Sequence, residues 1–100
     1  MHWISIVVLL AFAQLATAQE WARVRVEQSP RHREWVTIPY GNRSVEAFVA
    51  YPERSGKAPV VLVIHTIAGM IDWVESLADQ LAEAGYIAIA PDLLSGMAPN

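Results

Sequence analysis

Two short apolar runs, separated by a helical pattern, dominate the second half of the chain. The first run, Val60–Ile64, is rich in β-branched residues and contains no polar position, which is typical of a strand buried on both faces of a sheet. The second run, Tyr86–Ala90, closes on Pro91-Asp92. The order of strand, loop, helix and strand predicts one right-handed βαβ crossover and therefore an α/β fold.

The helix predicted between the two runs has one apolar face and one acidic face. Its apolar residues fall at i, i+3, i+4, i+7 and i+8, namely Val74, Leu77, Ala78, Leu81 and Ala82. Asp72 fits the N-cap with Glu75 as its capping-box partner, and Gly85 fits the C′ position that ends the helix. Glu75, Asp79 and Glu83 form an acidic stripe, which we interpret as a solvated face rather than a surface for a cation or a partner.

Residues 35–51 predict a β-hairpin that precedes the crossover. Strand-like stretches cover residues 35–39 and 44–51, and Gly41-Asn42 between them suits a two-residue turn because both residues tolerate positive φ. We expect the hairpin to form an antiparallel edge of the sheet.

The polar segment before the hairpin, residues 19–34, carries charges of both signs. Val24 and Val26 alternate with arginines, which permits a short edge strand that ends at Pro30. His32 lies among arginines in this segment, so we expect it to be exposed to solvent rather than catalytic.

The first 18 residues have the pattern of a secretory signal peptide. An apolar core over residues 4–13 precedes Ala16-Thr17-Ala18, an A-x-A cleavage site that would release Gln19, although the n-region has no lysine or arginine. A membrane anchor is the alternative, but the apolar run is shorter than the ~20 residues needed to span a bilayer. We therefore expect cleavage after Ala18, a secreted or periplasmic protein, and no stable membrane anchor.

Composition excludes several classes of protein and site. The formal net charge of -3 and the lack of a basic cluster argue against a nucleic-acid binder. The lack of cysteine excludes disulfides and a thiol nucleophile within these residues. We expect neither a metal nor a cofactor, because His2, His32 and His65 have no metal-ligand spacing and no glycine-rich phosphate loop occurs.

Several motifs in the crossover occur in a recognisable order and spacing. They are His65-x-Ile67-x-Gly69, Asp72-Trp73, ADQLA at 78–82, Gly85-Tyr86 and APDLL at 90–94, with upstream matches at 51–53 and 29–32. This set resembles the dienelactone hydrolase (carboxymethylenebutenolidase) family of the α/β-hydrolases. The resemblance implies that residues 35–100 are the N-terminal portion of such a domain, with the hairpin leading into a mostly parallel sheet. Because an α/β-hydrolase needs a much longer chain, it also implies a truncated one.

The resemblance further implies that the chain carries part of an oxyanion hole. In α/β-hydrolases the loop after the third strand supplies one backbone N–H to the developing oxyanion, and the match places this donor at Ile67. No G-x-S-x-G motif occurs, so the nucleophile, acid and base are missing and the nucleophile is expected beyond residue 100. The implied activity is hydrolysis of a small-molecule carboxylic ester or lactone through an acyl-enzyme. We expect the 100 residues alone to be inactive.

Thr66 departs from the family's usual His-Glu-Ile-Phe-Gly motif, in which the glutamate lies beside the nucleophile and helps to activate it. A threonine hydroxyl cannot accept a proton near neutral pH, so this departure counts against dienelactone itself. It leaves either other esters as substrates or an inactive protein. We expect His65 to anchor the loop by hydrogen bonds, Gly69 to serve its turn, and the Asp92 carboxylate to cap nearby backbone N–H groups.

A non-catalytic exported binding module and a decayed gene product are the alternative interpretations. The module would leave Val60–Ile64 and Tyr86–Ala90 partly exposed, although both runs have the composition of buried strands. Such exposed segments favour aggregation over a defined binding surface.

Overall fold

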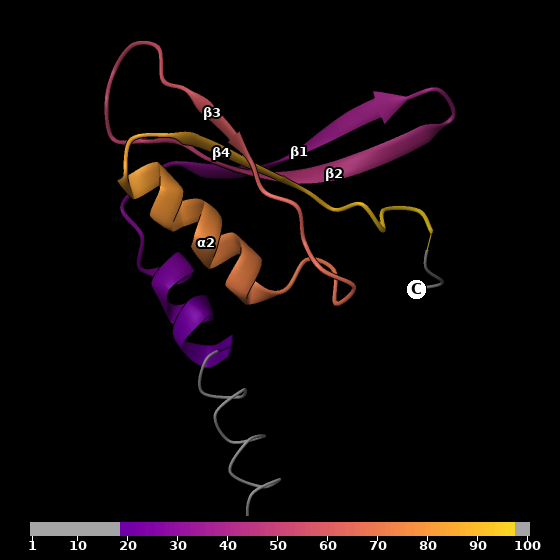
Figure 1. The fold of residues 1–100 in the computed structure, drawn as a ribbon, viewed down its shortest axis with the longest axis horizontal. Coiled ribbons are helices and arrows are strands. Elements are labelled where there is room, and N and C mark those ends of the chain that lie inside the picture. Colours follow the sequence, from indigo (N-terminus) through magenta and orange to yellow (C-terminus); the bar gives the residue numbers. More distant parts are fainter. Residues whose placement is uncertain (1–18, 98–100) are drawn as a thin grey trace, which may run out of the picture.

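The computed structural model describes residues 19–97, so the predicted signal peptide lies outside the described residues. Helical residues 19–27 lead into a hairpin, a short strand, a helix and a last strand. The strands and the later helix are β1 (Arg33–Tyr40), β2 (Arg43–Ala50), β3 (Val60–Leu62), α2 (Asp72–Glu83) and β4 (Ile87–Pro91). Helix α2 and residues 19–27 lie on the same side of the sheet (Figure 1). The predicted α/β fold, with its hairpin and its crossover, is confirmed.

The sheet has the strand order β1-β2-β4-β3. β1 and β2 pair antiparallel from Arg33↔Ala50 to Tyr40↔Arg43, and the turn between them uses Gly41 at a φ of 60°. β2 also pairs antiparallel with β4, whereas β3 pairs parallel with β4. Because the α2 crossover makes β3 and β4 parallel, their carboxyl ends meet at the same edge of the sheet.

Helix α2 begins one residue earlier than its capping pattern indicates. Its N-cap is Ile71, which has extended backbone angles, and the Ile71 carbonyl accepts the first helical hydrogen bond from the Val74 N–H at 2.9 Å. The predicted N-cap at Asp72 is therefore wrong, and the N-cap has no side-chain hydrogen bond. Asp72 and Glu75 instead lie in the first helical turn, where the helix dipole favours negative charge.

The helix ends as predicted at Gly85. The Gly85 N–H donates to the Ala82 carbonyl at 3.0 Å, and the Tyr86 N–H donates to the Leu81 carbonyl at 3.1 Å. This pair of bonds is a Schellman motif, which requires positive φ at C′, and Gly85 has a φ of 104°.

The core lies between α2 and one face of the sheet. Its buried members are Phe48, Ala50, Val63, Val74, Ala78, Ala82, Ala88 and Ala90. Leu77 and Leu81 are partly buried against this cluster, so the predicted apolar face of the helix is confirmed. Five of the eight core residues are alanine, which lets the helix and strand backbones approach closely.

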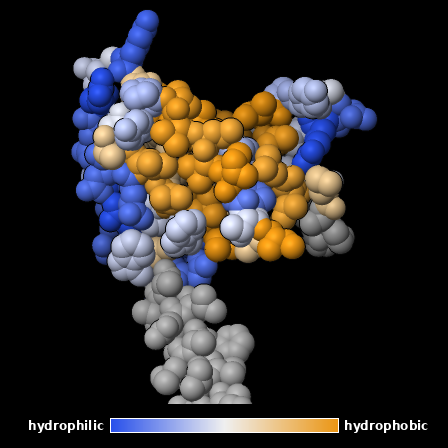
Figure 2. Space-filling model, viewed as in Figure 1, coloured by the Kyte–Doolittle hydropathy of each residue, from blue (hydrophilic) through white to orange (hydrophobic). Residues whose placement is uncertain are grey.

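The opposite face of β3 is exposed in the described part of the chain. Val60, Leu62 and Ile64 are 59%, 61% and 58% exposed. The expectation that Val60–Ile64 is buried on both faces is therefore wrong here, because among the described residues α2 covers one face only. Figure 2 shows hydrophobic residues gathered over the centre of the molecule in this view.

The edge strand predicted around Val24 and Val26 is also wrong, because residues 19–27 are helical. A helix places Ala22 and Val26 on one face, and Ala22 is fully buried while Val26 packs against the core. Arg23 and Glu27, also four residues apart, form an exposed ion pair at 3.3 Å. Residues four apart contact each other in a helix but lie too far apart to do so in an extended strand.

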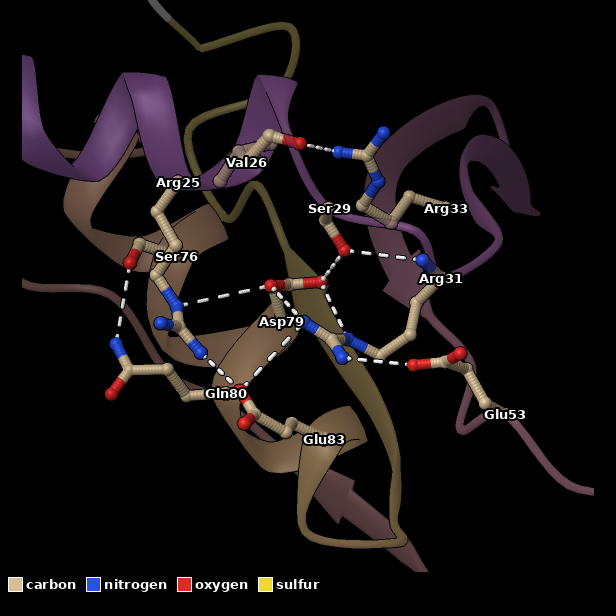
Figure 3. A network of polar contacts seen from close by, with 10 residues as sticks. All are labelled: Arg25, Val26, Ser29, Arg31, Arg33, Glu53, Ser76, Asp79, Gln80 and Glu83. Carbon is tan, nitrogen blue, oxygen red and sulfur yellow. Dashed lines mark hydrogen bonds and ion pairs between the residues drawn. The ribbon is translucent and has the colours of Figure 1, made fainter.

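Asp79 does not belong to a solvated acidic face, because it is fully buried. Figure 3 shows its carboxylate surrounded by side chains from the segment that precedes β1. Arg31 binds it in a bidentate manner, with Nε 3.1 Å from Oδ1 and Nη2 2.9 Å from Oδ2, and the Ser29 hydroxyl donates to Oδ1 at 2.5 Å. Arg25 lies beside this pair, with Nε 3.8 Å from Oδ2, and also contacts Glu83.

The charges and hydrogen bonds around Asp79 keep it ionised. Burial alone would raise the pKa of Asp79, but hydrogen bonds from Arg31 and Ser29 and the charges of Arg31 and Arg25 lower it below its usual value. The carboxylate therefore stabilises the fold above its unfolded-state pKa of about 3.9, and this stabilisation is lost as the pH falls through the lower folded-state pKa. Arg31 also binds Glu53 at 3.1 Å, so it joins α2 to the segment after β2.

We expect Asp79→Asn to destabilise the chain by about 3–5 kcal/mol, because the Arg31 guanidinium loses the buried carboxylate that it binds in a bidentate manner and keeps only exposed acids as partners. Glu83→Gln is the matched control, since the Glu83 side chain is 58% exposed. Its cost should stay below about 1 kcal/mol. Urea unfolding followed by tryptophan fluorescence measures both variants. Equal costs would show that the buried pair does not stabilise the fold.

Candidate oxyanion loop

The candidate site lies at the edge of the sheet where β3 and β4 end. The chain leaves β3 through residues 63–71 and leaves β4 through residues 92–96 (Figure 1). A cleft of about 460 Å³ lies between the two loops and the start of β2, lined by Ser44, Glu46, residues 68–70 and four residues of the 92–96 loop. Ligands of open α/β sheets bind at this carboxyl edge.

His65 links the two loops, and the prediction that it anchors its loop is confirmed. Its Nε2 lies 2.9 Å from the Leu93 amide nitrogen, and its Nδ1 lies 2.6 Å from the Thr66 carbonyl oxygen. Its side chain is 5% exposed, and the Asp92 carboxylate lies 3.8 Å from Nε2. With both ring nitrogens bound to backbone groups, the ring is held in one orientation.

The backbone of the loop turns sharply after Thr66. The Thr66 carbonyl accepts a hydrogen bond from the Gly69 N–H at 3.0 Å, and the Thr66 hydroxyl lies 3.4 Å from the Ala68 amide nitrogen. Gly69 has a φ of 76°, and a Cβ there would lie 3.2 Å from Leu94 Cδ1. The expected role of Gly69 in the turn is confirmed, because this position needs both positive φ and the absence of a side chain.

Ile67 lies at the tip of this turn, with its side chain fully exposed. Its N–H has no hydrogen-bond partner among residues 19–97, whereas the amides of Ala68, Gly69 and Ile71 all donate within the loop. The structure thus brings Thr66 and Ile67, the two predicted site residues, to the tip of a loop that also borders the cleft. What Ile67 offers chemically is a backbone hydrogen-bond donor.

The 92–96 loop is held by polar contacts that the sequence did not reveal. Arg43 donates to the Leu93 carbonyl at 2.8 Å and to the Ser95 carbonyl at 3.2 Å. The Ser95 hydroxyl donates to the Asp92 carbonyl at 2.6 Å and accepts from the Glu46 N–H at 3.1 Å. The Asp92 carboxylate caps the Leu94 N–H at 3.1 Å, as predicted. Ser95 is therefore a structural residue of the loop.

The described histidine outside the two loops lies on the surface. The His32 side chain is 67% exposed and lies beside Glu34, as expected for a surface histidine. Within residues 19–97, no group of three or more histidines and acids is arranged to hold a metal ion. The same residues contain no helix with the length and apolar character needed to cross a membrane.

Comparison with known proteins gives one consistent family. The model of the family described as "Dienelactone hydrolase family" matches residues 45–100. The chain is 40% identical over 67 residues to a protein of Escherichia coli (strain K12) called "Putative hydrolase fragment YghX", with 64% of this chain and 57% of that protein covered. It is 38% identical over 65 residues to a "Putative carboxymethylenebutenolidase" of Synechocystis, covering 65% of this chain and 26% of the relative.

A solved structure and a further relative agree with these matches. A crystal structure described as a putative dienelactone hydrolase from Klebsiella pneumoniae superposes with a TM-score of 0.59 at 33% identity, covering 63% of this chain and 27% of that one. A Bradyrhizobium protein called "Probable 2-oxo-3-(5-oxofuran-2-ylidene)propanoate lactonase" is 34% identical over 62 residues. The match spans little more than half of the Escherichia coli relative and about a quarter of the others.

We expect Gly69→Ala to cost more stability than Gly56→Ala, although both glycines have positive φ. A left-handed conformation costs a non-glycine residue about 1–2 kcal/mol at either position. Only at Gly69 does the new Cβ also press on Leu94, since nothing lies within 4 Å at Gly56. Urea unfolding and amide chemical shifts of residues 92–96 measure the difference. Unchanged shifts in Gly69→Ala would contradict the close approach of the two loops.

Proposed function

The chain belongs to the dienelactone hydrolase family, and we propose that it forms one wall of a site that hydrolyses a small-molecule carboxylic ester or lactone. The Ile67 N–H is one of the two donors that stabilise the oxyanion of the tetrahedral intermediate. The nucleophile, the acid and the base come from chain beyond residue 100, so the 100 residues alone are inactive. The observation that carries the proposal is the Ile67 N–H, which has no hydrogen-bond partner among residues 19–97, on a loop that borders a cleft.

Backbone geometry supports this role for the loop. An oxyanion donor stabilises the transition state only if it is fixed before the reaction, because reorganisation during the reaction would cancel the gain. The loop meets this requirement, since His65 and Gly69 each hold its backbone by hydrogen bonds at 3.0 Å or less. The donor itself is insensitive to side-chain identity, which agrees with the full exposure of the Ile67 side chain.

The threonine at position 66 favours the hypothesis that the substrate is an ester or lactone other than the dienelactone. It occupies the position where the family motif has a glutamate, and its hydroxyl already lies within 3.4 Å of the Ala68 amide nitrogen. A hydroxyl in this place supports the turn and supplies no carboxylate to a nucleophile. The names of the relatives from Synechocystis and Bradyrhizobium, a carboxymethylenebutenolidase and a lactonase, agree with lactone or ester chemistry for the family.

The proposal includes export of the protein. Its support is the apolar core and the A-x-A site of residues 1–18. We expect the protein purified from cells with a secretory pathway to begin at Gln19. Intact-mass and N-terminal peptide measurements check this, and a protein that retains Met1 and fractionates with membranes would favour the anchor instead.

The oxyanion role is testable in a chimera that carries a nucleophile. Residues 19–100 replace the matching N-terminal segment of the Synechocystis relative, so that Ser29 and Arg31 still bind Asp79. Hydrolysis of p-nitrophenyl acetate is then followed. Ile67→Pro removes the N–H and should lower kcat about 10²- to 10³-fold. Ile67→Ala is the matched control, because it keeps the N–H and trims only an exposed side chain, so its kcat should change little.

Two outcomes would contradict the proposal. If the two Ile67 variants reduce kcat equally in chimeras with unchanged circular dichroism, the N–H is not the donor. Ester turnover by residues 19–100 alone, lost on mutation of one of those residues, would place the nucleophile within this chain.

A further inference from the structure

His65 does more than anchor its loop, because its two ring nitrogens bind different backbone groups. One nitrogen faces a carbonyl oxygen and the other faces an amide N–H. We infer that His65 is the positioning residue of the oxyanion loop, that it acts only as the neutral Nδ1–H tautomer, and that protonation of its ring releases the loop. The inference rests on the proposed function only where it calls the loop an oxyanion loop. The tautomer and the contacts of the ring do not depend on that function.

The partners of the ring determine the tautomer. Nδ1 lies 2.6 Å from the Thr66 carbonyl oxygen, which can only accept a hydrogen bond, so Nδ1 must carry the proton. Nε2 lies 2.9 Å from the Leu93 amide nitrogen, which can only donate, so Nε2 must be the unprotonated acceptor. The two contacts require the same neutral form, and the ring is too buried for water to replace either partner freely, with 5% of its side chain exposed.

The His65 ring connects the Ile67 peptide to the hairpin through hydrogen bonds and the backbone of Leu93. The Thr66 carbonyl that receives the Nδ1–H belongs to the peptide whose N–H is that of Ile67, and it also accepts from Gly69. On the other side, the Leu93 carbonyl is held by Arg43 at 2.8 Å. A shift of the His65 ring therefore moves the peptide that carries the proposed oxyanion donor.

Protonation of His65 would break the hydrogen bond from the Leu93 N–H to Nε2 and favour an ion pair with Asp92. A second ring proton at Nε2 would point at the Leu93 N–H, and two donors cannot form a hydrogen bond. The Asp92 carboxylate lies 3.8 Å from Nε2 and would attract the imidazolium, while the Arg43 guanidinium, bound to the Leu93 carbonyl, is the other charged group on this side. The Asp92 carboxylate would then leave the Leu94 N–H, and the 92–96 loop would lose two of its amide contacts.

The tautomer is measured directly by long-range ¹H–¹⁵N correlation spectra of the full chain labelled with ¹⁵N-histidine. At pH 8 we expect the pattern of a fixed Nδ1–H tautomer for His65. The internal control is the exposed His32, whose Nε2 lies 3.3 Å from a Glu34 carboxylate oxygen, so its neutral ring should favour the opposite, Nε2–H, tautomer. On acidification, the hydrogen-exchange protection of the Leu93 amide should fall as the ring ¹⁵N shifts of His65 report a second ring proton. An Nε2–H or averaged tautomer of His65 would overturn the inference, as would Leu93 protection that is unchanged once the ring carries its second proton.

Two substitutions separate the two contacts of the ring. His65→Gln can place its carbonyl oxygen near Nε2 and so keep an acceptor for Leu93, whereas His65→Asn can keep a donor near Nδ1 and loses the Leu93 contact. We expect the Leu93 amide protection factor to fall about tenfold in His65→Asn and to be largely retained in His65→Gln. His32→Gln is the matched control and should leave it unchanged. Equal protection in the two His65 variants would contradict the assignment.

These readouts keep the inference separate from the proposed function. The tautomer and the amide protection need no turnover, so they stand or fall without the oxyanion role. In the chimera, His65→Asn should lower kcat while His65→Gln retains more of it, with KM little changed. If the spectra hold and kcat does not respond, the positioning is real and the oxyanion assignment is the part that fails.

Discussion

The buried carboxylate of Asp79 is the constraint on which the described fold depends. A fully buried charge is tolerated only when it is paired and hydrogen-bonded, and here Arg31 and Ser29 supply the pairing from 48 and 50 residues away. The pair holds the segment before β1 against α2, so that segment belongs to the domain. Because α2 begins directly after residues 65–71, fixing the helix also fixes where that loop ends.

Local signals in the sequence predicted much of this fold. Gly41 and Gly85 need positive φ for a tight turn and a Schellman motif, so each marks its element from sequence alone. The 3.6-residue period of α2 likewise follows from residues close together in the chain. The Asp72 N-cap failed because an aspartate is equally favourable in the first helical turn, and only the backbone angles of Ile71 distinguish the two positions.

What the sequence could not predict depends on contacts between distant segments. The period-four spacing of Asp79 with Glu75 and Glu83 looked like a solvated face, and nothing local reveals that Arg31 reaches it. The best available signal was that Ser29, Arg31 and Asp79 all lie within motifs shared with the family. The exposure of Leu62 and Ile64 was also missed. An apolar strand composition predicts burial on both faces only when other elements cover both faces. The candidate site could likewise be predicted only in part. The family motif located Ile67 and Thr66, whereas the contact between His65 and Leu93, 28 residues apart, could be seen only in the folded structure.

The central claim is that the Ile67 N–H faces the oxygen that becomes negative during ester hydrolysis. The most direct test is a crystal structure of the chimera inhibited by a p-nitrophenyl alkylphosphonate, whose phosphonyl oxygen occupies the oxyanion position once the nucleophile is labelled. We expect this oxygen at about 2.7–3.1 Å from the Ile67 nitrogen, the range of oxyanion-hole donors. A phosphonyl oxygen bound to other donors, with the Ile67 N–H facing solvent, would contradict it.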